Sequence, residues 1–132
     1  MTEDEACYAY AVAWNSLSPD VLIDKFDDDI RYTSQWVFDD INGKKRVSDY
    51  LRGKMDTMSN SPDAKVFAQL AETQPYPMYP NPPQPCVVVS QKTQEKMIGT
   101  VLFEVSKTGI SAIDFCCIPP PESTKRSGDF PD

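Results

Sequence analysis

The sequence contains no histidine. This absence excludes three kinds of site, because a histidine-based catalytic triad, a zinc ion held by histidine and an imidazole general base all need that side chain. No other feature of the sequence excludes as much chemistry.

Basic residues are scarce, at 13 against 20 acidic residues, which gives a net charge of −7. Nucleic-acid binding needs clustered lysine and arginine to neutralise phosphates. The two short basic runs, residues 44–46 and 125–126, stand beside acidic residues and are typical of solvated surface. The composition therefore predicts that nucleic acid is not a partner.

Long apolar runs are also missing, since no stretch reaches the roughly 18 residues of a membrane-spanning helix. The first residues are acidic, whereas a secretory signal begins with positive charge. We therefore expect a cytoplasmic protein that does not enter a membrane. Its four cysteines are then expected to be buried thiols, because Cys116 and Cys117 point to opposite faces of a strand and no CxxC pair is present.

The N-terminal half is predicted to be mainly helical. A capping box at residues 2–5 predicts a first helix that ends near residue 16. Ser18 begins a second predicted helix, which carries Phe26 on its buried side. Residues 44–58 show one apolar stripe and predict a third helix.

The remaining elements are predicted strands. Alternating side chains and β-branched residues predict strands over residues 30–38, 64–73 and 86–93, and a hairpin over residues 97–117. Helices gathered toward one end of the chain and mostly antiparallel strands toward the other are typical of an α+β fold. We expect one domain over residues 1–118, followed by an extended tail over residues 119–132.

Two stretches carry a resemblance to a known family: residues 10–34, YAVAWNSLSPDVLIDKFDDDIRYTS, and residues 41–51, INGKKRVSDYL. They contain a first helix ending in Asn, an acidic second helix ending in F-x-D-D, a short strand, and a Gly before the third helix. This order resembles the NTF2-like superfamily, the cystatin-like α+β barrel of SnoaL-like proteins and ketosteroid isomerases. The resemblance spans residues 7–118 and implies a cone, with three helices packed in a strongly curved, mostly antiparallel sheet.

The resemblance does not carry steroid-isomerase chemistry with it. Ketosteroid isomerases use an Asp base, with a Tyr and a protonated Asp as hydrogen-bond donors. On this sequence the Tyr falls on Tyr10, the base on Ser34 and the second donor near Val101. Serine does not abstract a proton from carbon at neutral pH, so isomerisation is not expected and no catalytic residue is assigned.

The resemblance instead implies an apolar, aromatic-lined interior that binds a small hydrophobic molecule. The residues expected to contact such a ligand are Tyr10, Trp14, Tyr32, Ser34, Trp36, Tyr50, Gln69, Val101, Phe103 and Phe115. The same side chains could simply fill the core. The hydroxyl of Tyr10 would then be satisfied by Ser34 or Gln69, instead of donating to a ligand.

No metal or cofactor is expected. The acidic clusters at residues 27–29 and 39–40 lack the spacing of a calcium loop and suit turns. If the protein were an isomerase, cyclase or hydrolase, Asp39 or Asp40 at the pocket mouth would be its acid. The lack of a matched acid–base set favours binding over catalysis.

Two further features allow more than one interpretation. The proline-rich loop, residues 74–85, has three possible roles. It could be a lid over the interior, with Tyr76, Met78 and Tyr79 as its contacts, or a passive long loop. It could also be a docking strip for a partner that recognises extended prolines. A non-catalytic homodimer is the alternative function. It would form through the outer sheet face, and the residues expected there are Ile98, Leu102, Ala112 and Cys116.

Overall fold

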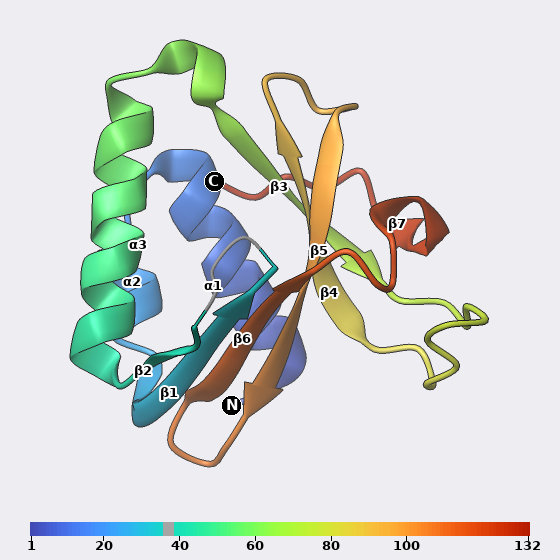
Figure 1. The fold of residues 1–132 in the computed structure, drawn as a ribbon, viewed down its shortest axis with the longest axis horizontal. Helices are drawn as coiled ribbons and strands as arrows, with labels where there is room; N and C mark the ends of the chain where they lie inside the picture. Colours follow the sequence, from blue (N-terminus) through green and yellow to red (C-terminus); the bar gives the residue numbers. More distant parts are fainter. Residues whose placement is uncertain (36–38) are drawn as a thin grey trace.

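The computed structural model describes residues 1–35 and 39–132. Within them the chain forms three α-helices, α1 (Glu3–Ser16), α2 (Asp20–Ile23) and α3 (Lys44–Ser59) (Figure 1). The strands are β1 (Phe26–Ser34), β2 (Ile41–Asn42), β3 (Val66–Glu72), β4 (Pro85–Gln91), β5 (Met97–Val105), β6 (Ile110–Cys116) and β7 (Lys125–Arg126). Two 3₁₀ turns, η1 (Pro62–Ala64) and η2 (Pro121–Ser123), complete the elements.

The strands form one sheet in the order β2-β1-β6-β5-β4-β3-β7. Only β1 and β6 run parallel among the paired strands described, so the sheet is mixed and mostly antiparallel. Both long helices lie on one side of the sheet (Figure 1), where α1 packs against β3, β4 and β5 and α3 packs against β1 and β2. The predicted α+β architecture is confirmed.

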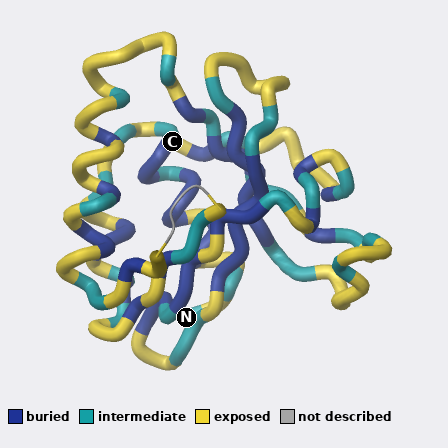
Figure 2. The backbone as a smooth tube through the Cα atoms, viewed as in Figure 1, coloured by how far each residue is buried: buried dark blue, intermediate teal, exposed yellow. Residues whose placement is uncertain are grey.

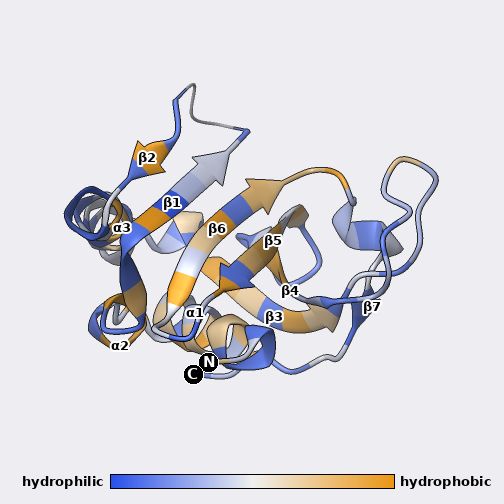
Figure 3. Ribbon diagram, turned by 90° about the horizontal axis from the view of Figure 1, so that it is seen from below, coloured by the Kyte–Doolittle hydropathy of each residue, from blue (hydrophilic) through white to orange (hydrophobic). Residues whose placement is uncertain are grey.

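The core lies between α1 and the inner face of the sheet. Figure 2 shows buried residues concentrated along α1 and the central strands, whereas the outward side of α3 and the proline-rich loop are largely exposed. The hydropathy follows the same division, with hydrophobic residues on β3 to β6 and hydrophilic ones over much of α3 (Figure 3). Among the described residues, no helix is long and apolar enough to cross a membrane.

The predicted capping box at the start of α1 is confirmed. The backbone N–H of Thr2 donates to Oε1 of Glu5 at 3.1 Å, and the N–H of Glu5 donates to Oγ1 of Thr2 at 3.2 Å. These bonds satisfy two backbone donors that a helix N-terminus otherwise leaves unpaired. The helix ends at Leu17, which adopts a left-handed conformation with φ of 53°.

The second helix is shorter than predicted, and the assignment of Phe26 to it is wrong. Phe26 begins β1 and pairs with Ile110 of β6. The N–H of Ile110 also donates to the carbonyl oxygen of Lys25 at 2.7 Å. This long-range pairing with β6 overrides the local helical pattern, which carries no information about a distant strand. The end of the predicted strand, at residues 36–38, lies outside the described residues.

A β-bulge changes the face of the sheet to which the side chain of Ile98 points. The register between β4 and β5 shifts between Val89 and Ser90. Ile98, predicted on the outer face, instead packs against the main core on the inner side. Because a bulge re-aims the side chains next to it, a strict two-residue alternation fails here.

The outer face of the sheet is covered by the chain itself. Leu102, Cys116 and Cys86 form a second hydrophobic cluster, against which Tyr79 of the proline-rich loop packs. Leu102 is 9% exposed, and Ala112 and Cys116 are each 7% exposed. The predicted dimer face is therefore largely buried within one chain.

The proline-rich loop is not a lid over the interior. Tyr76 and Tyr79 exchange backbone hydrogen bonds, and the Tyr79 hydroxyl donates to Oε1 of Gln84 at 3.4 Å. The loop lies on the side of the sheet away from α3 (Figure 1). The lid interpretation is wrong because Tyr79 contacts the outer cluster and not the interior.

The predicted tail, residues 119–132, contains a further strand. Its β7 pairs with β3, placing Arg126 opposite Ala71. Farther along, the N–H of Gly128 donates to Oε1 of Gln69 at 2.7 Å. This backbone partner explains how a buried glutamine at the edge of the sheet is satisfied.

Candidate functional site

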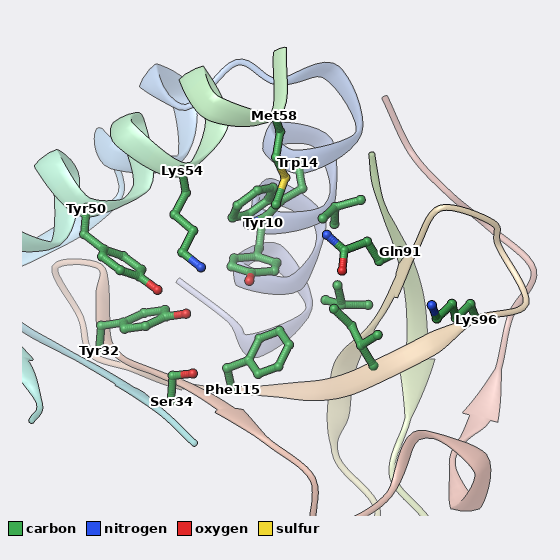
Figure 4. A pocket seen from close by; sticks show the side chains of 13 residues that line it. Tyr10, Trp14, Tyr32, Ser34, Tyr50, Lys54, Met58, Gln91, Lys96 and Phe115 are labelled. Atoms are coloured by element: carbon green, nitrogen blue, oxygen red, sulfur yellow. The ribbon is translucent and has the colours of Figure 1, made fainter. Parts of the chain in front are cut away.

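A cavity of about 450 Å³ opens between α3, α1 and the inner face of the sheet (Figure 4). Side chains of 13 residues line it, and they come from α1, α3 and five strands. A volume of about 300–1,000 Å³ is typical of small-molecule sites. The interior therefore combines a packed core with an open space large enough for a ligand.

Six of the predicted site residues line this cavity: Tyr10, Trp14, Tyr32, Ser34, Tyr50 and Phe115. Three others do not line it, namely Gln69, Val101 and Phe103. Gln69 faces the C-terminal segment, Val101 is fully buried, and Phe103 packs edge-on against the Tyr10 ring at 5.3 Å. The remaining predicted residue, Trp36, lies outside the described residues.

The cavity also has lining residues that sequence reasoning missed: Lys54, Met58, Val66, Val89, Gln91, Lys96 and Ile98. The helical spacing of the sequence could have indicated two of these residues, Lys54 and Met58. Tyr50, Lys54 and Met58 are spaced by four residues, so they share one face of α3. Lys54 was passed over because a charged residue on a helix ordinarily faces solvent.

Three hydroxyls gather at the end of the cavity formed by α3 and β1. The rings of Tyr32 and Tyr50 lie 5.0 Å apart between centroids, at an interplanar angle of 45°. Tyr32 is hydrogen-bonded to both Tyr50 and Ser34. Figure 4 shows Lys54 extending from α3 into the space between Tyr50 and Tyr10. Its Nζ lies 5.5 Å from the centroid of the Tyr50 ring.

The buried phenols remain protonated. Burial raises the pKa of Tyr10 above its usual range, and the nearby indole N–H of Trp14 opposes this only in part. Burial likewise raises the pKa of Tyr32. At neutral pH both side chains are therefore hydrogen-bonding hydroxyls and not bases.

The indole N–H of Trp14 is an unused donor in the same cavity. Trp14 is 7% exposed, and its Nε1 has no hydrogen-bond partner of normal geometry, although it lies close to Tyr10. A buried donor without a partner is unfavourable unless a ligand or water satisfies it. This feature suits a ligand oxygen in the pocket.

The lining lacks an acid. No Asp or Glu is among the described residues that line the cavity, and Asp39 and Asp40 are exposed and not part of it. A search of the described residues for three or more clustered metal-ligand side chains finds none. The arrangement can enclose an apolar body and donate hydrogen bonds to it, but it offers no carboxylate as a general base.

No protein-family model and no curated protein matches the sequence. Several solved structures match the fold. An NTF2-like protein of unknown function from Cytophaga hutchinsonii has a TM-score of 0.57 at 11% identity, covering 90% of this chain and 94% of its own. A SnoaL-like protein of unknown function from Burkholderia thailandensis has a TM-score of 0.58 at 11% identity, covering 96% and 94%.

A third structure carries a ligand. It is a Mycobacterium tuberculosis protein in complex with estradiol-17beta-hemisuccinate, with a TM-score of 0.57 at 14% identity, covering 87% of this chain and 93% of its own. Likeness at such low identity concerns the fold and does not transfer an activity. The arrangement of helices and strands and these matches together show that the chain has the NTF2-like fold.

Proposed function

We propose that the protein binds a small, largely apolar molecule in the cavity between α3 and the sheet. The observation that carries the proposal is the open volume of about 450 Å³ lined by aromatic and aliphatic side chains together with hydroxyl groups. Well-packed cores leave few voids larger than a water molecule, so a cavity of this size is suited to a ligand. A solved structure with the same fold holds a steroid ester.

The proposal is for binding without catalysis. The buried phenols are held in their protonated form, and no carboxylate of the described residues lines the cavity. A base able to remove a proton from carbon is therefore missing from the described lining. The cytoplasm is the compartment proposed for the protein, because its four cysteines would stay reduced there.

The alternative is a homodimer through the outer sheet face, where the predicted residues leave little exposed surface. Leu102, Ala112 and Cys116 are already covered within the chain, and Ile98 lines the cavity on the other side. A dimer would need a different surface, or would need the proline-rich loop to move away.

Thermal unfolding with a panel of aryl ketones, naphthols, steroids and aryl carboxylates tests the proposal. A ligand that binds only the folded state stabilises it by mass action, by about 2.7 kcal/mol at one hundred times its Kd. We expect at least one compound to raise the midpoint in a concentration-dependent way. Absence of any shift across the panel would contradict the proposal.

Two variants show whether a shift comes from this cavity. Met58→Trp places a bulky ring at the lining and should abolish the stabilisation. Met78→Trp makes the same change in the proline-rich loop, where Met78 is 71% exposed, and should leave it intact. Equal responses of the two variants would place binding elsewhere.

A further inference from the structure

The charges of the cavity are all of one sign. Lys54 and Lys96 are the charged residues among its described lining, although acidic residues outnumber basic ones by 20 to 13 in the whole chain. Local charge of one sign in a cleft attracts ligands of the opposite sign. The protein thus offers a positive site within a negatively charged molecule.

One of the two lysines lies beside hydroxyl groups at one end of the cavity. Lys54 and the hydroxyls of Tyr32 and Ser34 lie together near α3 and β1 (Figure 4). The opposite wall carries aliphatic residues of β3, β4 and β5, namely Val66, Val89 and Ile98, with Gln91 and Lys96 on the same side (Figure 4). The group around Lys54 suits a polar head, and the aliphatic residues and Phe115 suit an apolar body.

Lys54 makes no ion pair among the described residues. The salt bridges recorded there join Lys45 to Asp49 and Arg52 to Asp20. Its neighbours four residues away on α3 are Tyr50 and Met58, neither of which is acidic. The one recorded contact of its Nζ is with the Tyr50 ring at 5.5 Å. A carboxylate from a ligand would give this amine a stronger, charge-assisted partner.

Two side chains of α1 supply further hydrogen-bond donors to the cavity. Tyr10 stays protonated, and the indole N–H of Trp14 is buried without a partner. An ionised carboxylate only accepts hydrogen bonds, through two oxygens that together take up to about four. An ammonium, phenols and an indole N–H therefore match a carboxylate better than they match a cationic head group.

We propose that the pocket is specific for amphipathic organic acids, whose apolar body lies against Phe115 and the aliphatic wall and whose carboxylate binds Nζ of Lys54 and the neighbouring hydroxyls. This proposal rests on the binding function proposed above and adds the chemical class of the ligand. Lys54 is its specificity-determining residue.

A matched pair of probes tests the proposal. Naphthylacetate and naphthylacetamide have the same shape and size, but only the acid is charged at neutral pH. Calorimetric titration of the wild-type protein should give about tenfold tighter binding of the acid, the size expected for one charge-assisted hydrogen bond. Lys54→Met keeps an unbranched side chain of similar length and should remove this preference, so that the acid binds no more tightly than the amide.

The control variant is Lys107→Met. Lys107 is an exposed residue of the turn between β5 and β6 and does not line the cavity, so this change alters net charge equally without touching the site. The Lys107→Met variant should keep the tenfold preference for the acid. If this variant lost the preference, the cause would be long-range electrostatics and not recognition by Lys54.

The outcomes separate the two proposals. If acid and amide bind wild type equally, or if Lys54→Met keeps the preference, the specificity for acids is wrong while the apolar pocket stands. If neither probe binds up to its solubility limit, while neutral compounds of the first panel do bind, the acid class is again wrong. If no compound of either set binds, both proposals fail.

Discussion

Asn15 and Ala68 are joined by two hydrogen bonds that run in opposite directions. Nδ2 of Asn15 donates to the carbonyl oxygen of Ala68, and the N–H of Ala68 donates to Oδ1 of Asn15, both at 2.8 Å. Nδ2 also donates to the carbonyl oxygen of Pro131 at 2.7 Å. One side chain at the end of α1 thus pairs with the edge of β3 and holds the C-terminal segment beside it.

We expect Asn15→Ala to lower the free energy of unfolding by about 2 kcal/mol, because it leaves both backbone groups of Ala68 without partners. Asn60→Ala is the matched control. Asn60 is exposed and its side chain donates only to the carbonyl oxygen of Asp56 in its own helix, so its loss should change stability by less than about 0.5 kcal/mol. Urea unfolding measures both, and equal effects would contradict the role of Asn15.

Two glycines should respond to alanine in opposite ways. At Gly109 a Cβ would overlap the carbonyl oxygen of Lys25, so Gly109→Ala should destabilise the protein by about 3 kcal/mol. At Gly53, on the exposed side of α3, a Cβ would meet nothing within 4 Å. Gly53→Ala should therefore stabilise by about 0.5–1 kcal/mol through helix propensity. Chemical denaturation of both variants checks this, and a destabilised Gly53→Ala would contradict the packing of α3.

The buried thiols predict how stability depends on pH. Burial raises the pKa of Cys86 from its ordinary value of 9.0 to about 12, and burial also raises the pKa of Cys116 to about 12. Above pH 9 the unfolded chain loses these protons while the folded chain keeps them, so their contribution is full below pH 9 and is lost toward pH 12. Urea unfolding at several pH values should show this decline.

Cys86→Ala provides the control for that decline. The variant should be less stable at neutral pH because a buried side chain is truncated, but its stability should fall less steeply above pH 9. An unchanged slope would mean that other groups, such as the buried phenols, cause the decline.

Tyr10→Phe separates the two interpretations of the Tyr10 hydroxyl. Gln69 does not line the cavity, and its Oε1 already accepts a hydrogen bond from the N–H of Gly128. We therefore expect stability without ligand to change by less than about 1 kcal/mol. The affinity for a ligand that carries an oxygen should fall severalfold. A large loss of stability with unchanged affinity would assign the hydroxyl to the core.

Local patterns in the sequence predicted much of the fold. The capping box at Thr2 and Glu5, the stripe of α3 and the hairpin of β5 and β6 all depend on residues close in sequence, and the structure confirms each of them. Six pocket residues followed from the resemblance to the NTF2-like fold, which implies that inward side chains of α1, α3, β1 and β6 surround one space.

The parts that escaped prediction depend on long-range contacts. Phe26 joins β1 because it pairs with Ile110, 84 residues later by their numbers, and Ile98 turns inward at a bulge that its own strand does not reveal. Tyr79 likewise covers the outer face of the sheet only because the proline-rich loop folds back toward Leu102. Lys54 was missed for another reason, since a charged residue on a helix is ordinarily solvated surface.

The indole N–H signal of Trp14 in a proton–nitrogen correlation spectrum tests the central claim most directly. The chain has two tryptophans, so Trp36→Phe identifies the signal that belongs to Trp14. Because Nε1 of Trp14 lies buried at the cavity without a partner, a bound ligand with an acceptor oxygen should move this signal progressively until it saturates. Saturation alongside the thermal shift confirms a ligand in this pocket, whereas an unmoved signal under a ligand that stabilises the protein would contradict it.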